Sequence, residues 1–134
     1  MKRIRKRGVT CLNAKAATGV GTTIDTRDFD YLVLEIGTAS SANLTVKFAG
    51  SVSETAPTFS SAQSVSNHWD YLYCYDLNSA SGVTGDTGFV VSGTDDFKLY
   101  KVNVDGINWF NANVTARSAG SVTVKLSGYS NFGG

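Results

Sequence analysis

One histidine and one pair of adjacent carboxylates are the residues of this chain that could take part in acid–base or nucleophilic catalysis. A Ser-His-Asp site needs a histidine base, and His68 is the only histidine in the 134 residues. Bulky Trp69 follows it, and no Gly-x-Ser-x-Gly nucleophile motif lies nearby. Asp95 and Asp96 are adjacent, so on a strand their side chains would point to opposite faces and could not flank one substrate. We therefore expect no enzymatic activity.

The residue types that hold cofactors and metals are present, but their spacing does not fit a site. Gly19-Val20-Gly21 lacks the third glycine of a dinucleotide-binding loop. Cys11 and Cys74 are far apart, with only His68 as a further soft ligand, which favours two free, buried thiols over a zinc site. The acidic stretch 25–30 could present oxygens to calcium, but Arg27 in its middle favours a structural turn. We expect no cofactor and no metal.

A run of alternating aromatic residues is the best candidate for a small-ligand site. On one strand over 69–77, Trp69, Tyr71, Tyr73 and Tyr75 would share a face. Such a face could stack on sugar rings, or it could belong to the core or to a subunit interface, because aromatic rings dominate both. The candidate interface or ligand aromatics are Phe59, Trp69, Tyr71, Tyr73, Tyr75 and Trp109.

The first seven residues form a basic arm. The net charge of +1 combines five bases in this arm with seven bases against 11 acids in the remainder of the chain. A tether to a protein partner, a nucleic-acid contact and a plain solvated tail are the three possible roles. Nucleic-acid-binding domains spread Lys and Arg over a folded surface, whereas this body is acidic, so we favour the protein tether over nucleic acid. The predicted partner-binding residues are Lys2, Arg3, Ile4, Arg5, Lys6 and Arg7.

Strands separated by turns account for the remaining pattern. With 14 Gly, one Pro, 42% hydrophobic residues and no apolar helical stripe, the composition favours an all-β chain of one domain. Residues 51–67 form a long irregular connection. Gly37 ends one predicted strand, and Asp105-Gly106 and Ser118-Ala119-Gly120 are turns that predict a three-stranded meander. The predicted strands are 9–12, 22–24, 30–36, 43–49, 69–77, 89–91, 97–104, 107–116 and 121–127.

These elements predict a single β-sandwich, jelly-roll-like or immunoglobulin-like, with a distorted barrel as the alternative. We divide the chain into an N-terminal arm, residues 1–8, and a β-sandwich domain, residues 9–134. Neither an export signal nor a membrane-spanning stretch is expected. The predicted core positions of the C-terminal strands are Tyr100, Val102, Val104, Phe110, Ala112, Val114, Val122, Val124 and Leu126.

The order of several short segments resembles a family of phage proteins. These segments are 17–22, 30–36, 46–51, 54–59, 67–71, 94–96 and 104–109, followed by the Gly-Ser-Val-Thr-Val strand from Gly120. Together they are similar to the β-sandwich virion proteins encoded among the structural genes of tailed bacteriophages. The resemblance covers most of residues 15–127, implies a structural role on the particle and supplies no catalytic residues.

The resulting hypothesis is a non-enzymatic virion protein made in the host cytoplasm, in the form of a capsid decoration or auxiliary protein. Its arm and loops would contact the major capsid protein, another virion protein or a neighbouring copy. Decoration subunits commonly bind as symmetric oligomers, so a homo-oligomer such as a trimer is expected. A tail, head-to-tail connector or fibre-base protein and a carbohydrate-binding module for host adsorption are the alternatives.

Overall fold

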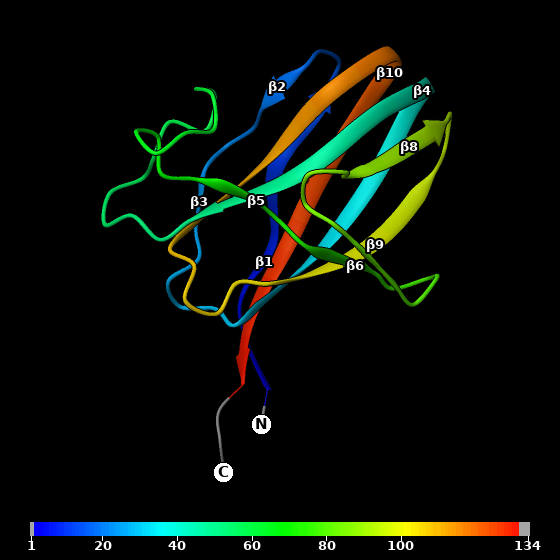
Figure 1. Ribbon diagram of the computed structural model, residues 1–134. Coiled ribbons are helices and arrows are strands. Elements are labelled where there is room, and N and C mark those ends of the chain that lie inside the picture. Colours follow the sequence, from blue (N-terminus) through cyan, green and yellow to red (C-terminus); the bar gives the residue numbers. More distant parts are fainter. Residues whose placement is uncertain (1, 132–134) are drawn as a thin grey trace.

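Ten β-strands and no helix make up the part of the chain that the structure describes. The computed structural model describes residues 2–131, with side chains placed for residues 7–130. The strands are β1 (Lys2–Lys15), β2 (Gly19–Val20), β3 (Ile24–Asp25), β4 (Tyr31–Ser51), β5 (Asp70–Leu72), β6 (Cys74–Asp76), β7 (Ser81–Val83), β8 (Phe89–Gly93), β9 (Phe97–Asn103) and β10 (Trp109–Asn131) (Figure 1). The predicted all-β fold is confirmed.

Two long antiparallel strands form the frame of the molecule. β4 and β10 pair from Tyr31 opposite Tyr129 to Ser51 opposite Trp109. Both strands bend midway, so that each draws a V in Figure 1 with its apex at the upper right. The bend coincides with positive φ angles at Ser40, Ser41 and Gly120, and with register shifts between residues 114 and 121. A continuous strand pair therefore turns back on itself.

The bend divides the sheet into two halves that share β4 and β10. In the first half, which contains residues 31–37 of β4, the strand order is β1-β10-β4-β9-β6-β7. In the second half, which contains residues 42–51 of β4, β2 and β3 pair with β10 while β5 and β8 pair with β4. The two layers predicted for a sandwich are thus two halves of one bent sheet.

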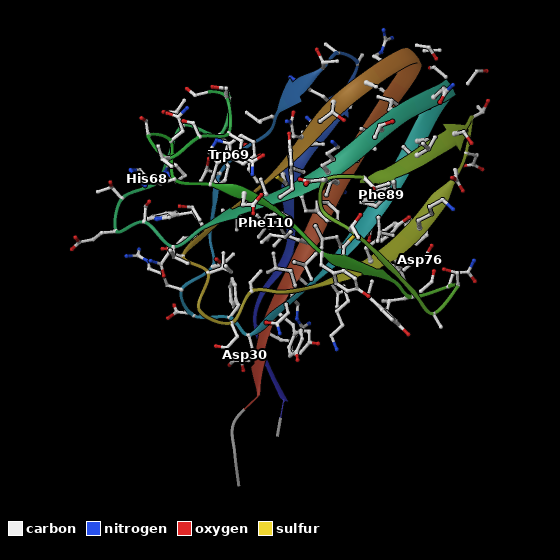
Figure 2. The ribbon with its side chains drawn as sticks, in the orientation of Figure 1. Asp30, His68, Trp69, Asp76, Phe89 and Phe110 are labelled. Carbon is white, nitrogen blue, oxygen red and sulfur yellow. The ribbon has the colours of Figure 1, made fainter. Side chains whose placement is uncertain are left out.

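The core lies between the two halves. Phe48 in the second half contacts the rings of Phe89, Phe110 and Tyr100, with centroid separations of 5.3, 5.5 and 6.4 Å. Phe89 and Tyr100 belong to opposite halves, and their rings stack at 4.0 Å. Figure 2 shows Phe89 and Phe110 inside the bend. All nine predicted core residues of the C-terminal strands are buried, so this prediction is confirmed.

The predicted meander is wrong, and so is the predicted end of a strand at Gly37. Residues 109–131 form one strand, and β9 pairs with β4 and β6 instead of with β10. Ser118-Ala119-Gly120 is a bend within β10 rather than a hairpin turn, because β4 runs beside it on both sides of the bend. β4 likewise continues through Gly37 instead of ending there.

The backbone of the basic arm forms the beginning of β1. Lys2 pairs with Asn131, Arg3 with Ser130 and Ile4 with Tyr129. Since β4 begins at Tyr31, opposite Tyr129, the first two pairs extend beyond β4 as a two-stranded ribbon. A register shift between Lys6 and Val9, with a positive φ at Gly8, separates this segment from the remainder of β1. The side chains of residues 2–6 lie outside the described ones.

The close approach of β4 and β10 at the bend can be tested by comparing two glycines. Both Gly106 (φ +82°) and Gly120 (φ +71°) have a positive φ, which costs an alanine about 1–2 kcal/mol. A Cβ at Gly106 would meet nothing within 4 Å, whereas one at Gly120 would lie 2.4 Å from the Cα of Ala42. Overpacking adds about 1–3 kcal/mol. In urea unfolding we expect Gly120→Ala to be clearly the more destabilising; equal losses would contradict the bend.

Candidate functional site

The long connection between β4 and β5, residues 52–69, covers the outer face of the second half. It places Phe59 and Trp69, which are 3% and 8% exposed, against Ala49 of β4. The Trp69 ring lies 5.9 Å from that of Phe59 and 5.0 Å, edge to face, from that of Tyr71. Val20 and Trp109 pack against the same cluster. The connection is therefore anchored by its own aromatic side chains and is irregular, as predicted.

Hydrogen bonds fix both ends of this loop. The indole N–H of Trp109 donates to the carbonyl of Ser53 at 2.9 Å, and that of Trp69 donates to the carbonyl of Ser61 at 3.2 Å. The buried Ser51 hydroxyl donates to the carbonyl of His68 at 2.6 Å and accepts from the N–H of Ser53 at 3.1 Å. Ser51 thus joins Ser53, near the start of the loop, to His68, near its end.

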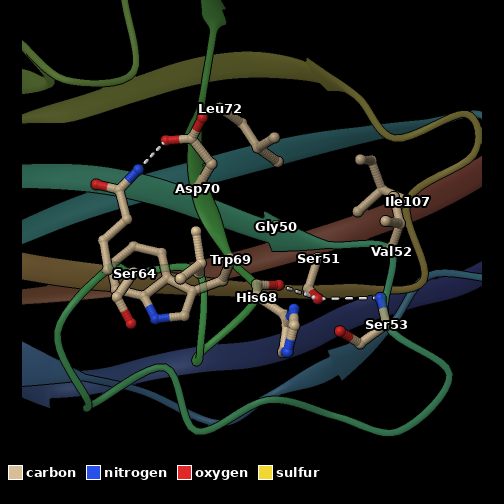
Figure 3. Close-up of a pocket in the computed structure, with 12 residues that line it drawn as sticks. Gly50, Ser51, Val52, Ser53, Ser64, His68, Trp69, Asp70, Leu72 and Ile107 are labelled. Atoms are coloured by element: carbon tan, nitrogen blue, oxygen red, sulfur yellow. Dashed lines mark hydrogen bonds between the residues drawn. The ribbon is translucent and has the colours of Figure 1, made fainter.

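A groove of about 730 Å³ lies between the two ends of the loop (Figure 3). Gly50, Leu72 and Ile107 form its apolar floor. A Cβ at Gly50 would lie 2.7 Å from a terminal carbon of Leu72 and 3.1 Å from Ile107, so it would force the end of the Leu72 side chain to shift. The rim carries both polar and apolar side chains: Val52, Ser53, Gln63, Ser64, Val65, His68, Trp69 and Asp70.

The polar residues of the groove do not form a catalytic arrangement. Figure 3 shows that Ser51 bonds the backbone carbonyl of His68, not its ring. The Asp70 carboxylate accepts from the side chain of Gln63 and, at 2.8 Å, from the N–H of Tyr71. Among the residues that the structure describes, no group of three metal-ligating side chains occurs. The geometry of the groove is suited to binding.

The prediction that one strand carries all four aromatic residues of 69–77 is wrong. β5 pairs with β4 in the second half, whereas β6 pairs with β9 in the first half. Tyr73 lies between β5 and β6, where the chain crosses from one half to the other. Trp69 is consequently buried, Tyr71 is half-buried, and Tyr73 and Tyr75 are 59% and 38% exposed over the first half. The four rings form no common platform for a flat ligand.

The acidic stretch 25–30 forms a turn. The guanidinium of Arg27 donates to both carboxylate oxygens of Asp25, at 2.9 and 2.5 Å, and lies 4.9 Å from the centroid of the Trp109 ring. Its hydrogen bond to Asp25 raises the pKa of Arg27 above the ordinary value. Because this cation holds the Asp25 carboxylate, the turn lends no support to a calcium site.

The two cysteines are free and buried, as predicted. Burial raises the pKa of Cys11 to about 11 and that of Cys74 to about 12. Both side chains are therefore thiols at neutral pH, and a thiol is a much weaker nucleophile than a thiolate. Neither Cys11 nor Cys74 is therefore a reactive cysteine.

Some exposed apolar residues were not singled out by the sequence reasoning. Leu77, Phe97 and Leu99 are 40%, 60% and 39% exposed on the side of the first half away from the core. A signal was available, because Phe97 and Leu99 alternate with the predicted core residues Tyr100 and Val102.

Among the described residues, no helix has the length and apolar character needed to cross a membrane.

The anchoring role of Ser51 gives a direct test of the loop. Ser51→Ala removes the hydroxyl that holds His68 and Ser53, so we expect a loss of about 1 kcal/mol in the free energy of unfolding. Amide hydrogen exchange within 52–69 should become faster. The exposed Ser60 is the control, and Ser60→Ala should change stability by less than about 0.5 kcal/mol. Unchanged exchange in Ser51→Ala would contradict the anchoring role.

Comparison with known proteins gives one informative likeness. No protein-family model and no curated protein sequence matches the chain. A solved structure, described as the crystal structure of SPBc2 prophage-derived protein YomS, superimposes with a TM-score of 0.68 over 97% of this chain and 96% of that one. The two sequences are 14% identical. At this identity, the likeness shows that the two chains share a fold over nearly their whole lengths.

Proposed function

We propose that this protein is a non-enzymatic structural subunit of a bacteriophage particle, and specifically a capsid decoration or auxiliary protein. The observation that carries the proposal is the shared fold with a protein described as prophage-derived, over nearly the full length of both chains. The segment order seen in the sequence supports the same origin independently. A small all-β subunit with buried thiols suits a role in assembly.

The surface features support attachment to other proteins. The groove beside loop 52–69 combines an apolar floor with two exposed valines, Val52 at 68% and Val65 at 91%. Exposed apolar side chains around a polar-rimmed hollow are typical of sites that receive a partner's side chains. In this proposal the loop and the basic arm contact the major capsid protein, another virion protein or a neighbouring copy, and the protein resides in the virion after synthesis in the host cytoplasm.

The other functions considered differ in their support. A tail, head-to-tail connector or fibre-base position belongs to the same class, and the location on the particle distinguishes it from decoration. A carbohydrate-binding role depends on a row of accessible rings. Trp69 is 8% exposed and the row is split between the two halves, so no observation favours that role.

Particle analysis tests the proposal. Phage particles produced in cells that express the chain should retain it through density-gradient purification, as measured by quantitative mass spectrometry. An electron-microscopy map should show it on the outside of the capsid. Absence from purified particles would refute the structural role, and density on the tail would replace decoration with the tail alternative.

The basic arm can be tested in the same assay. Deleting residues 2–7 would also remove the pairing partner of the end of β10, so neutralisation is the cleaner change. We expect the variant with Lys2, Arg3, Arg5, Lys6 and Arg7 all replaced by Gln to fold normally and to lose particle occupancy. Its circular dichroism and unfolding midpoint provide the folding control. Full occupancy would exclude the charges of the arm from attachment.

A further inference from the structure

The charge of the groove beside loop 52–69 comes from one acidic residue. Asp70 lines it, and none of the described residues that line it is Lys or Arg. Of the six acidic side chains in residues 48–97, Asp70 is the one that lines the groove. Both hydrogen bonds that reach Asp70 end on Oδ1, so Oδ2 keeps its capacity to accept from a cation. The groove is therefore suited to a positively charged partner.

The floor of the groove adds an apolar requirement. Gly50, Leu72 and Ile107 leave a hollow without polar side chains, and the exposed Val52 and Val65 continue it at the rim. A volume of about 730 Å³ accommodates several side chains of an extended segment, within the usual size range of ligand sites. The best-matched occupant is an extended segment that carries several positive charges around an apolar residue.

The N-terminal segment of this chain has that composition. Residues 2–7 read Lys-Arg-Ile-Arg-Lys-Arg, which is five cations with one isoleucine among them. Their backbone is already extended in β1, and beyond Tyr129 the ribbon of β1 and β10 projects past Tyr31, the first residue of β4. The backbone of this N-terminal segment pairs with residues 128–131 of the same chain. The segment would therefore have to break that pairing to leave β10.

We infer that the groove of one copy binds the basic N-terminal ribbon of a second copy. The isoleucine of the segment matches the apolar floor, and its cations match Asp70. Such a contact joins two different surfaces, so each copy is both donor and acceptor. Repeating it generates a ring when the rotation closes and a chain when it does not. The inference names the partner of the arm within the proposed function, but it does not depend on a virion role.

Sedimentation velocity of the isolated protein tests the contact. At low salt we expect a concentration-dependent mass above the 14.2 kDa monomer, which falls as salt is added, because charge pairing is screened. Asp70→Lys should weaken association about tenfold or more, the effect expected for a close charge pair across an interface. Asp86→Lys is the matched control, since it makes the same charge change at an exposed acid of the same segment outside the groove.

A mixing experiment distinguishes this contact from a symmetric one. The arm variant with all five bases changed to Gln and the Asp70→Lys variant should each be monomeric alone. Mixed, they should form a one-to-one complex, because the intact arm of Asp70→Lys fits the intact groove of the arm variant. A wild-type protein that stays monomeric at low salt, equal effects of Asp70→Lys and Asp86→Lys, or no complex on mixing would each overturn the inference. Particle occupancy is measured separately, so the virion role can fail or hold independently.

Discussion

The structure depends on the pairing of β4 with β10 through a shared bend. Every other strand attaches directly or in sequence to this pair, and both halves of the core face inward because the pair turns back on itself. Three residues with positive φ, Ser40, Ser41 and Gly120, lie at the turn, where the register of the ladder shifts before pairing resumes on the other side. Bends that carry strands from one layer to the next are a known solution for closing a β core. The N-terminal ribbon and the groove lie at the two ends of this frame.

The position of the groove follows from that frame. β4 ends at Ser51 and β5 returns antiparallel beside it, so the intervening loop must cross the end of the second half. Phe59 and Trp69 then hold the loop to the outer face, while Gly50, Leu72 and Ile107 lie at the other side of the strand, with Gly50 buried and the two side chains half-buried. The chain crosses to the first half at Tyr73, which separates the aromatic residues into buried and exposed pairs.

Local alternation along the chain was enough to predict the all-β fold and the inward-facing residues of the C-terminal strands, because a pleated strand buries every second side chain. It could not predict the bend. Gly37 and Ser118-Ala119-Gly120 resemble the ends of strands, and the same residue types serve a hairpin turn or a bend within a strand. Which one forms depends on whether β4 runs alongside, a contact between residues about eighty positions apart. The groove was equally hidden, since Gly50, Leu72 and Ile107 meet only through long-range register.

The charge distribution has a second consequence for the sheet edges. β1 is the outer strand of the first half, and an exposed edge can pair with any extended chain. Five cations at its beginning oppose such indiscriminate pairing, because two copies of the same edge repel each other. In the proposed head-to-tail contact, the same cations meet Asp70 of another copy instead of a like-charged edge. That contact and the repulsion between like edges both act against edge-to-edge aggregation.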